Sequence, residues 1–223
     1  MASGSGERVP ISRVDDLFDE LWARSTAAAE RGDRSGYFAA LYTLMTGRVA
    51  QGLRLGRFSN PERLERLTCH FAVRYLDAFD AHQRSEPAPR CWALAFETAT
   101  LWRPIVVQHL LLGMNAHINF DLGIAAAGVS VDANIAEIQA DFDEINLVLA
   151  ELLGDVQERL GAVSPWMGLL DVIGGRTDEA LVNFSMRHAR DAAWGVAERF
   201  AATEAAGWPG AEIELDERMS RFA

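Results

Sequence analysis

Residues 105–127 read IVVQHLLLGMNAHINFDLGIAAA. Apolar side chains occupy almost every side of this stretch, which predicts a central helix that its neighbours bury. Between Met114 and Leu122 four polar residues interrupt the apolar run, and these are Asn115, His117, Asn119 and Asp121. Burying a polar group without a partner costs roughly 2–7 kcal/mol, so this segment must build either a hydrogen-bonded network or a site.

The same segment carries a second pattern. From Met114 to Leu122 apolar and polar residues alternate strictly, which is typical of a half-buried strand. A single strand among helices has no pairing partner, so we favour a helix here as well.

Helical periodicity extends along the rest of the chain. Asn60 followed by Pro61 is a typical helix start, with a capping residue and then proline in the first turn. We expect helices over about residues 12–29, 37–51, 61–82, 91–101, 132–160 and 177–206, and a short one that starts at Ser164.

These elements predict an all-α fold. The expected architecture is a single domain, a bundle of about seven or eight helices around the buried central helix. We place this domain at residues 12–206, after a flexible N-terminus at residues 1–11. Gly207, Trp208, Pro209 and Gly210 should break the last helix before a polar C-terminal tail at residues 207–223.

Composition bounds the class of protein. The chain has 223 residues, 49% of them hydrophobic and 24% charged, which is ordinary for a globular domain with a real core. The net charge of −11 argues against nucleic acid and against an anionic membrane as partners. A small-molecule ligand or substrate is the expected partner, and the oligomeric state stays open.

The basic residues and the cysteines narrow the chemistry. All 21 basic residues are arginine, which disfavours Schiff-base and lysine-base mechanisms. Cys69 and Cys91 form no CxxC motif and have apolar neighbours, so we expect free buried thiols. The first residues lack the apolar segment of a signal peptide, and no apolar run is long enough to span a membrane, so a cytoplasmic location is expected.

Helical geometry divides the four polar residues of the central helix into two pairs. His117 and Asp121 are four residues apart and share one face, whereas Asn115 and Asn119 share another. The first pair could hold a divalent metal, act as an acid/base dyad, or form a buried structural contact. We expect the second pair to belong to the scaffold, with Asn119 as a candidate ligand contact.

The next predicted helix carries polar residues at the edge of its apolar stripe. Asp141 and Asn146 lie where apolar residues would be expected. If the two helices pack together, these side chains converge with His117 and Asp121 in one site. A polar layer that fixes helix register is the structural alternative.

Three more residues complete the candidate site. Arg187 and Trp194 lie on the last predicted helix, where His188 is expected to face inward. Arg103, next to Trp102 and Pro104 at a helix break, is a candidate for the rim of a pocket.

Several common catalytic motifs are missing from the sequence. The chain has no GxGxxG motif after a strand, no GxxxxGK[ST] loop, no GxSxG elbow and no pair of ExxH motifs. Asp141, Asp143 and Glu144 could bind magnesium with a diphosphate substrate, but we identify no second acidic motif to match them.

The chain resembles an uncharacterised bacterial family of helical proteins, a domain of unknown function. The resemblance covers about residues 37–200 and depends mainly on residues 110–122 with their Asn-Ala-His-Ile-Asn core. Weaker support comes from Asp141-Phe142 with Ile145-Asn146, Trp92 with Ala95-Phe96, and Ala193-Trp194. It implies no activity. The HxxxD spacing is also similar to a fragment of helical zinc phospholipases and nucleases, whose further histidine ligands have no match here.

The leading functional interpretation is an enzyme that acts on a small molecule. His117, Asp121 and Asp141 are its candidate catalytic residues, and His117 and Asp121 are the candidate ligands of a divalent metal in a hydrolase or lyase. Candidate substrate contacts are Asn119, Asn146, Arg103, Arg187 and Trp194. The alternatives are a metal-free acid/base cyclase or lyase, and a non-catalytic binding or interaction protein with a structural polar layer.

Overall fold

The computed structural model describes residues 10–130, 134–140, 142–145 and 177–221. Within these residues the protein is helical and contains no strand, which confirms the all-α prediction. The predicted single bundle of helices around a buried central helix is confirmed as well.

The first half of the chain forms four helices. They are α1 (Val14–Arg31), α2 (Gly36–Arg54), α3 (Pro61–Gln83) and α4 (Arg90–Ala99). α1 ends at Gly32, whose φ of 64° is left-handed and therefore suits a residue without a side chain. α3 begins as predicted, because the Asn60 side chain accepts a hydrogen bond from the Arg63 backbone at 3.0 Å.

The central helix is continuous but changes its winding. It consists of α5 (Val106–Met114), the π-helix η1 (Asn115–Leu122) and α6 (Gly123–Val129). In a π-helix each N–H bonds to the carbonyl five residues earlier, so a turn holds more residues than an α-turn. The strand alternative for residues 114–122 is therefore wrong, and the helix that we predicted there is a π-helix.

The last part of the chain contributes α9 (Thr177–Ala202), the 3₁₀ turn η2 (Ala205–Gly207) and α10 (Trp208–Ser220). Residues 135–140 and 142–145 are also helical. The predicted break near Gly207 is present, but the polar tail is wrong, because α10 follows with Pro209 in its first turn. Proline is tolerated there because the first N–H groups of a helix need no helical acceptor.

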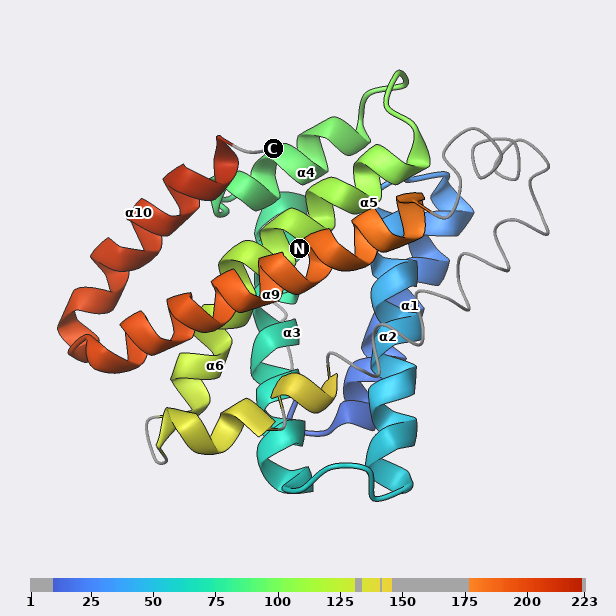
Figure 1. Ribbon diagram of the computed structural model, residues 1–223. Helices are drawn as coiled ribbons and strands as arrows, with labels where there is room; N and C mark the ends of the chain where they lie inside the picture. Colours follow the sequence, from blue (N-terminus) through green and yellow to red (C-terminus); the bar gives the residue numbers. More distant parts are fainter. Residues whose placement is uncertain (1–9, 131–133, 141, 146–176, 222–223) are drawn as a thin grey trace, which may run out of the picture.

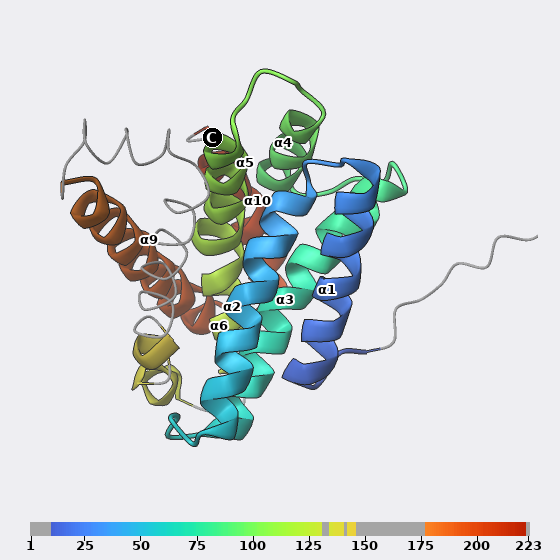
Figure 2. The same ribbon diagram turned by 90° about the vertical axis from the view of Figure 1, so that its right-hand side faces the viewer.

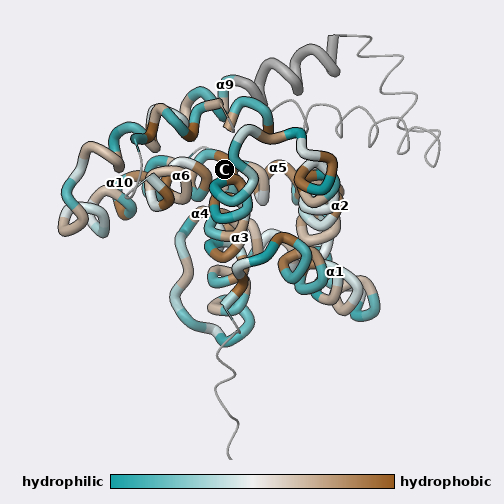
Figure 3. Tube along the Cα trace, turned by 90° about the horizontal axis from the view of Figure 1, so that it is seen from below, coloured by the Kyte–Doolittle hydropathy of each residue, from teal (hydrophilic) through white to brown (hydrophobic). Residues whose placement is uncertain are grey.

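The helices pack on two sides of the central helix. α1, α2 and α3 lie on one side of α5 and α6, and α9 lies on the other, as Figures 2 and 3 show. In Figure 1 α9 runs along the central helix, and α10 then turns back toward α4. The main apolar cluster draws residues from all these layers, and both cysteines are buried and free, as predicted.

The central helix is apolar because it is enclosed by protein. Residues 108–129 are long and apolar enough to cross a membrane, but 67% of that stretch is buried inside the fold. This burial accounts for its composition, as it does for the core helix of any helical bundle.

Close helix packing depends on a glycine where α6 meets α9. A Cβ atom at Gly123 would lie 2.5 Å from the Ala193 carbonyl oxygen and 2.7 Å from Val196. Only a residue without a side chain permits this approach between the helices.

We therefore expect Gly123→Ala to lower the free energy of unfolding by about 1–3 kcal/mol, since the added methyl group overpacks the contact. Gly195→Ala is the matched control, because a Cβ at Gly195 on α9 has no neighbour within 4 Å. That control should raise the stability by up to about 1 kcal/mol through helix propensity. Urea unfolding measures both, and equal stabilities of the two variants would contradict the close packing of α6 on α9.

Candidate functional site

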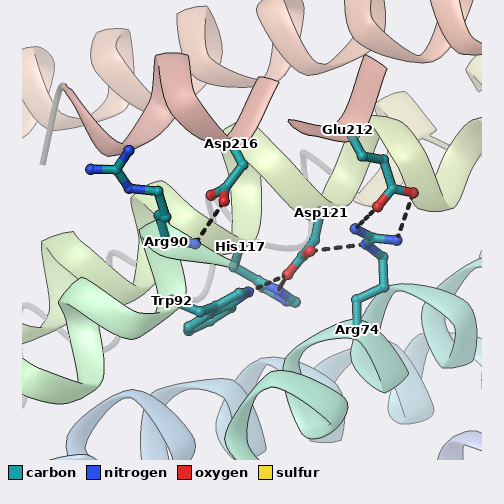
Figure 4. Close-up of polar contacts among 7 residues, drawn as sticks. All are labelled: Arg74, Arg90, Trp92, His117, Asp121, Glu212 and Asp216. Carbon is teal, nitrogen blue, oxygen red and sulfur yellow. Dashed lines mark hydrogen bonds and ion pairs between the residues drawn. The ribbon is translucent and has the colours of Figure 1, made fainter. Parts of the chain in front are cut away.

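Asp121 of η1 is a buried carboxylate at the centre of a polar network (Figure 4). Its side chain is 1% exposed. Oδ1 accepts a hydrogen bond from Arg74 Nε of α3 at 2.9 Å, and Oδ2 accepts one from Trp92 Nε1 of α4 at 2.7 Å. A carboxylate at this depth is tolerated only with such donors and a compensating cation.

Helix α10 extends this network. Arg74 also donates to both carboxylate oxygens of Glu212, at 3.4 and 3.5 Å. One turn further along α10, Asp216 accepts hydrogen bonds from the backbone N–H groups of Arg90 and Cys91 at the start of α4 (Figure 4). A carboxylate at a helix N-terminus is stabilised by the helix dipole as well as by these bonds. The segment predicted to be a tail is therefore part of the structure around Asp121.

His117 lies beside Asp121, as the sequence predicted. Its Nδ1 is 3.6 Å from Asp121 Oδ2, slightly longer than a hydrogen bond. Its ring stacks on Phe71 with 3.6 Å between the centroids, and Tyr42 packs against it edge-on at 4.4 Å. Rings of Phe38, Tyr75 and Trp92 surround it at 5.5 to 6.3 Å.

This environment keeps His117 neutral at pH 7. Burial among aromatic rings lowers its pKa below the ordinary value, the charge of Asp121 opposes the shift, and Arg190 and Arg74 add to it. The neighbouring carboxylate favours the tautomer with the proton on Nδ1. Nε2 then keeps a lone pair that can accept a hydrogen bond.

His117 also lines a pocket. Its cavity volume is about 60 Å³. Its walls are mostly apolar, with aliphatic side chains from α2, α3 and η1, among them Met45, Val49, Leu67, Ile118 and Leu122. We call this hollow the His117 pocket. A cavity of this volume has room for a few water molecules or for a ligand of few heavy atoms, and it is smaller than the roughly 300–1,000 Å³ of a drug-sized site.

Three residues that line the His117 pocket carry buried polar atoms without a partner in the described part of the chain. In the described part of the chain, the Tyr42 hydroxyl, the Thr46 hydroxyl and both ring nitrogens of His117 have no hydrogen-bond partner. Burial and the charge of Asp121 raise the pKa of Tyr42 well above its ordinary value, so its hydroxyl stays protonated. Unsatisfied groups of this kind are costly and call for an explanation, such as a bound ligand or water.

Arg190 of α9 forms part of the pocket wall. Arg190 is only 5% exposed, and this burial lowers the pKa of its guanidinium to about 10. The side chain therefore remains charged at pH 7. Its charge also disfavours a proton on His117. Ala193, Ala197 and Phe200 are buried on the same face of α9 as Arg190. His188 does not lie on this buried face. The prediction that His188 faces inward is wrong, since the residue is exposed.

Other predicted site residues lie away from the pocket. Asn119 donates a hydrogen bond to Asn115 at 2.8 Å, which confirms the second pair, and Asn115 in turn donates to the Met219 carbonyl of α10. Arg103 is exposed, with its guanidinium 5.6 Å from the ring centre of Trp102. Trp194 donates to Glu198 at 3.2 Å and does not line the pocket.

Three predicted residues cannot be placed. Asp141 and Asn146 lie outside the described residues, as does the side chain of Arg187. Their predicted convergence with His117 therefore stays a prediction.

The predicted metal site has little support in the described residues. No group of three or more histidine, cysteine, aspartate or glutamate side chains there could hold a metal ion. Both oxygens of Asp121 already accept hydrogen bonds, and one of the donors is a cation. The contact between His117 and Asp121 thus fits an acid/base or structural pair better than a pair of metal ligands.

The family of the chain follows from comparison with known proteins. A model of a family of unknown function, DUF5995, matches residues 14–223. The chain belongs to this family. No curated protein and no solved structure matches it. The match confirms the resemblance to a helical family of unknown function, and the function of this DUF5995 member must be argued from its site.

Three residues of this site in the DUF5995 protein, Arg74, Tyr42 and Thr46, were not among the predicted site residues. Arg74 could have been found by the criterion that selected His117, because it interrupts the apolar run Phe71-Ala72-Val73-Arg74-Tyr75-Leu76. The hydroxyl-bearing residues of α2 give no such signal. Threonine and tyrosine are common in cores, and only packing shows whether their hydroxyls have partners.

We expect Arg74→Gln to lower the free energy of unfolding by about 3 kcal/mol, since it leaves the buried Asp121 carboxylate without its cation. The matched control is Arg54→Gln, because Arg54 pairs with Asp15 at 3.0 Å while both side chains are exposed. That change should cost less than about 1 kcal/mol. Chemical denaturation measures the difference, and comparable costs would show that Asp121 does not need Arg74.

His117 should make stability depend on pH. Its folded pKa is lowered, so the unfolded chain takes up a proton first as the pH falls through about 6.5, and stability is lost below that value. The loss is at most about 1.4 kcal/mol per pH unit for one proton. His117→Phe should flatten the profile between about pH 7 and pH 5. Unfolding curves across this range test it, and an unchanged slope in the variant would contradict the neutral buried imidazole.

Proposed function

We propose that this protein binds a small, largely apolar organic molecule with a hydroxyl or carbonyl group in the His117 pocket. One observation carries the proposal: an apolar pocket contains three buried side chains whose polar atoms have no partner among the described residues. A purely structural core would replace Thr46 by valine and Tyr42 by phenylalanine without loss. A ligand explains why these hydroxyl groups are present.

A ligand hydroxyl can donate to one of these polar atoms and accept from another, whereas a ligand carbonyl can only accept. Neutral His117 presents the Nε2 lone pair as an acceptor, and the hydroxyls of Tyr42 and Thr46 can donate to an oxygen of the ligand. Tyr42 and Thr46 are four residues apart and therefore share one face of α2. The hydrocarbon part of the ligand would pack on Phe71, Met45 and Leu67. Methionine side chains adapt to ligands of different shape.

The pairing of His117 with Asp121 also supports metal-free acid/base chemistry on the bound molecule. The carboxylate lies 3.6 Å from Nδ1 and orients the imidazole, so that Nε2 could take a proton from the ligand. The resulting imidazolium would be stabilised by Asp121, as in other histidine–aspartate pairs. Such an enzyme would be a lyase or an isomerase rather than a metal-assisted hydrolase.

A structural polar layer is the second candidate function of these residues. It is favoured by the way in which Asp121, Arg74 and Glu212 connect η1 to α3 and α10. This hypothesis explains the satisfied carboxylate but not the unpartnered hydroxyls of α2. The two hypotheses therefore differ in what they predict for ligand binding.

Phenol and toluene are suitable probes, because they differ only in a hydroxyl group in place of a methyl group. We expect both to bind the wild type. His117→Phe should reduce the affinity for phenol relative to toluene by about fivefold or more, since the phenol hydroxyl loses its acceptor inside an apolar pocket. Titration calorimetry with each probe gives the ratio.

The matched control is His109→Phe. His109 is also buried and its ring nitrogens also lack partners among the described residues, but it does not line the pocket. This variant should keep the wild-type ratio of affinities. A wild type that binds neither probe, or a ratio that His117→Phe leaves unchanged, would favour the structural layer.

A further inference from the structure

Exposed apolar side chains gather where α4 is joined to α5. Ten large apolar side chains are exposed among the described residues, and five of them fall within residues 101–111. We call these five the α4–α5 patch, and they are Leu101, Trp102, Ile105, Val106 and Leu111. Trp102 is 78% exposed, more than any of the others. A contiguous group of this kind marks an interaction surface more often than scattered single residues do.

The patch lies on a projecting part of the molecule. The loop between α4 and α5 extends beyond the neighbouring helices in Figures 1 and 2. Behind it, a shallow groove of about 410 Å³ between the two helices includes Pro104, Gln108 and Leu111 in its lining. Leu101, Trp102 and Ile105 belong to this projecting loop, which we call the tip, and Val106 and Leu111 follow on α5.

The charge around the patch differs from that of the whole chain. No acidic residue occurs between Glu97 and Asp121, although the chain has 32 acidic residues and a net charge of −11. The guanidinium of Arg103 lies over the Trp102 ring, and Arg34 of the α1–α2 loop donates a hydrogen bond to the Leu101 carbonyl. The nearby Asp33 lies 3.9 Å from Arg31. The tip is thus apolar with cationic neighbours.

We propose that the α4–α5 patch docks on the surface of a lipid bilayer. Tryptophan and arginine suit the boundary between headgroups and hydrocarbon, because each has an apolar body and a polar end. Leu101 and Ile105 beside them would enter the acyl boundary, as the apolar faces of interfacial proteins do.

Net charge does not oppose this contact at physiological salt. The screening length there is about 8 Å, so a bilayer that touches the tip is affected mainly by the charges near the tip. The expectation that a chain of net charge −11 avoids anionic membranes holds for the molecule as a whole. It does not extend to the tip itself, because residues 98–120 include Arg103 and no acidic residue.

Co-sedimentation with vesicles of phosphatidylcholine and phosphatidylglycerol at physiological salt tests the proposal. We expect the wild type to sediment with the vesicles and the double variant Leu101→Ser/Trp102→Ser to lose at least about tenfold in partition coefficient, since it exposes two large apolar side chains fewer to the bilayer. The matched control, Trp22→Ser/Leu55→Ser, removes two exposed apolar residues of α1 and α2 outside the patch and should bind like the wild type.

Circular dichroism and the thermal midpoint establish that each variant is folded. A wild type that stays in the supernatant overturns the proposal, as does a patch variant that sediments like the control variant. Sedimentation velocity identifies the competing occupant. A dimer that the patch variant abolishes, together with no vesicle binding, would assign the patch to a second copy of the chain.

Discussion

The buried carboxylate of Asp121 constrains the rest of the structure. It lies on the central helix with its side chain 1% exposed, where an ionised group needs hydrogen bonds and a cation. Arg74 of α3 and Trp92 of α4 donate hydrogen bonds to the carboxylate, and Arg74 supplies the cation. Glu212 of α10 accepts a further hydrogen bond from Arg74. Four segments far apart in the sequence must therefore come together at one point.

The π-helical segment η1 separates the two polar pairs of the central helix. Residues 115–122 place the two asparagines toward α10 and the histidine–aspartate pair into the core. π-Helical turns are rare in proteins, and those that occur are often at functional sites. Here the segment brings a neutral imidazole to the wall of an apolar pocket. The N-terminal end of the same central helix, at the start of α5, belongs to the exposed α4–α5 patch.

The pocket and the patch have different physical origins. The residues that line the pocket carry buried polar atoms without a partner among the described residues, and a bound molecule would supply one. The patch contains exposed apolar side chains whose cost is unexplained unless something covers them. Both features oppose stability, and neither would be retained by selection for folding alone.

The sequence by itself determined most of the helices and the two polar pairs of the central helix. Periodicity located α1 to α4, the central helix and α9, because the apolar face of a helix repeats every few residues. Spacing alone paired His117 with Asp121 and Asn115 with Asn119, since residues four apart share a helix face. The same criterion, applied to Arg74, would have found the cation of the network.

Tertiary structure alone decided which helices meet. Trp92, Glu212 and the hydroxyls of Tyr42 and Thr46 have no local pattern that connects them to His117, because their roles depend on contacts between distant segments. The winding of η1 and the helical state of α10 were missed for the same reason. Residues 208–220 are polar on most sides, and they form a helix where Arg74 and the start of α4 supply partners for Glu212 and Asp216. Local propensity sets the elements, whereas burial and the satisfaction of charge set their places.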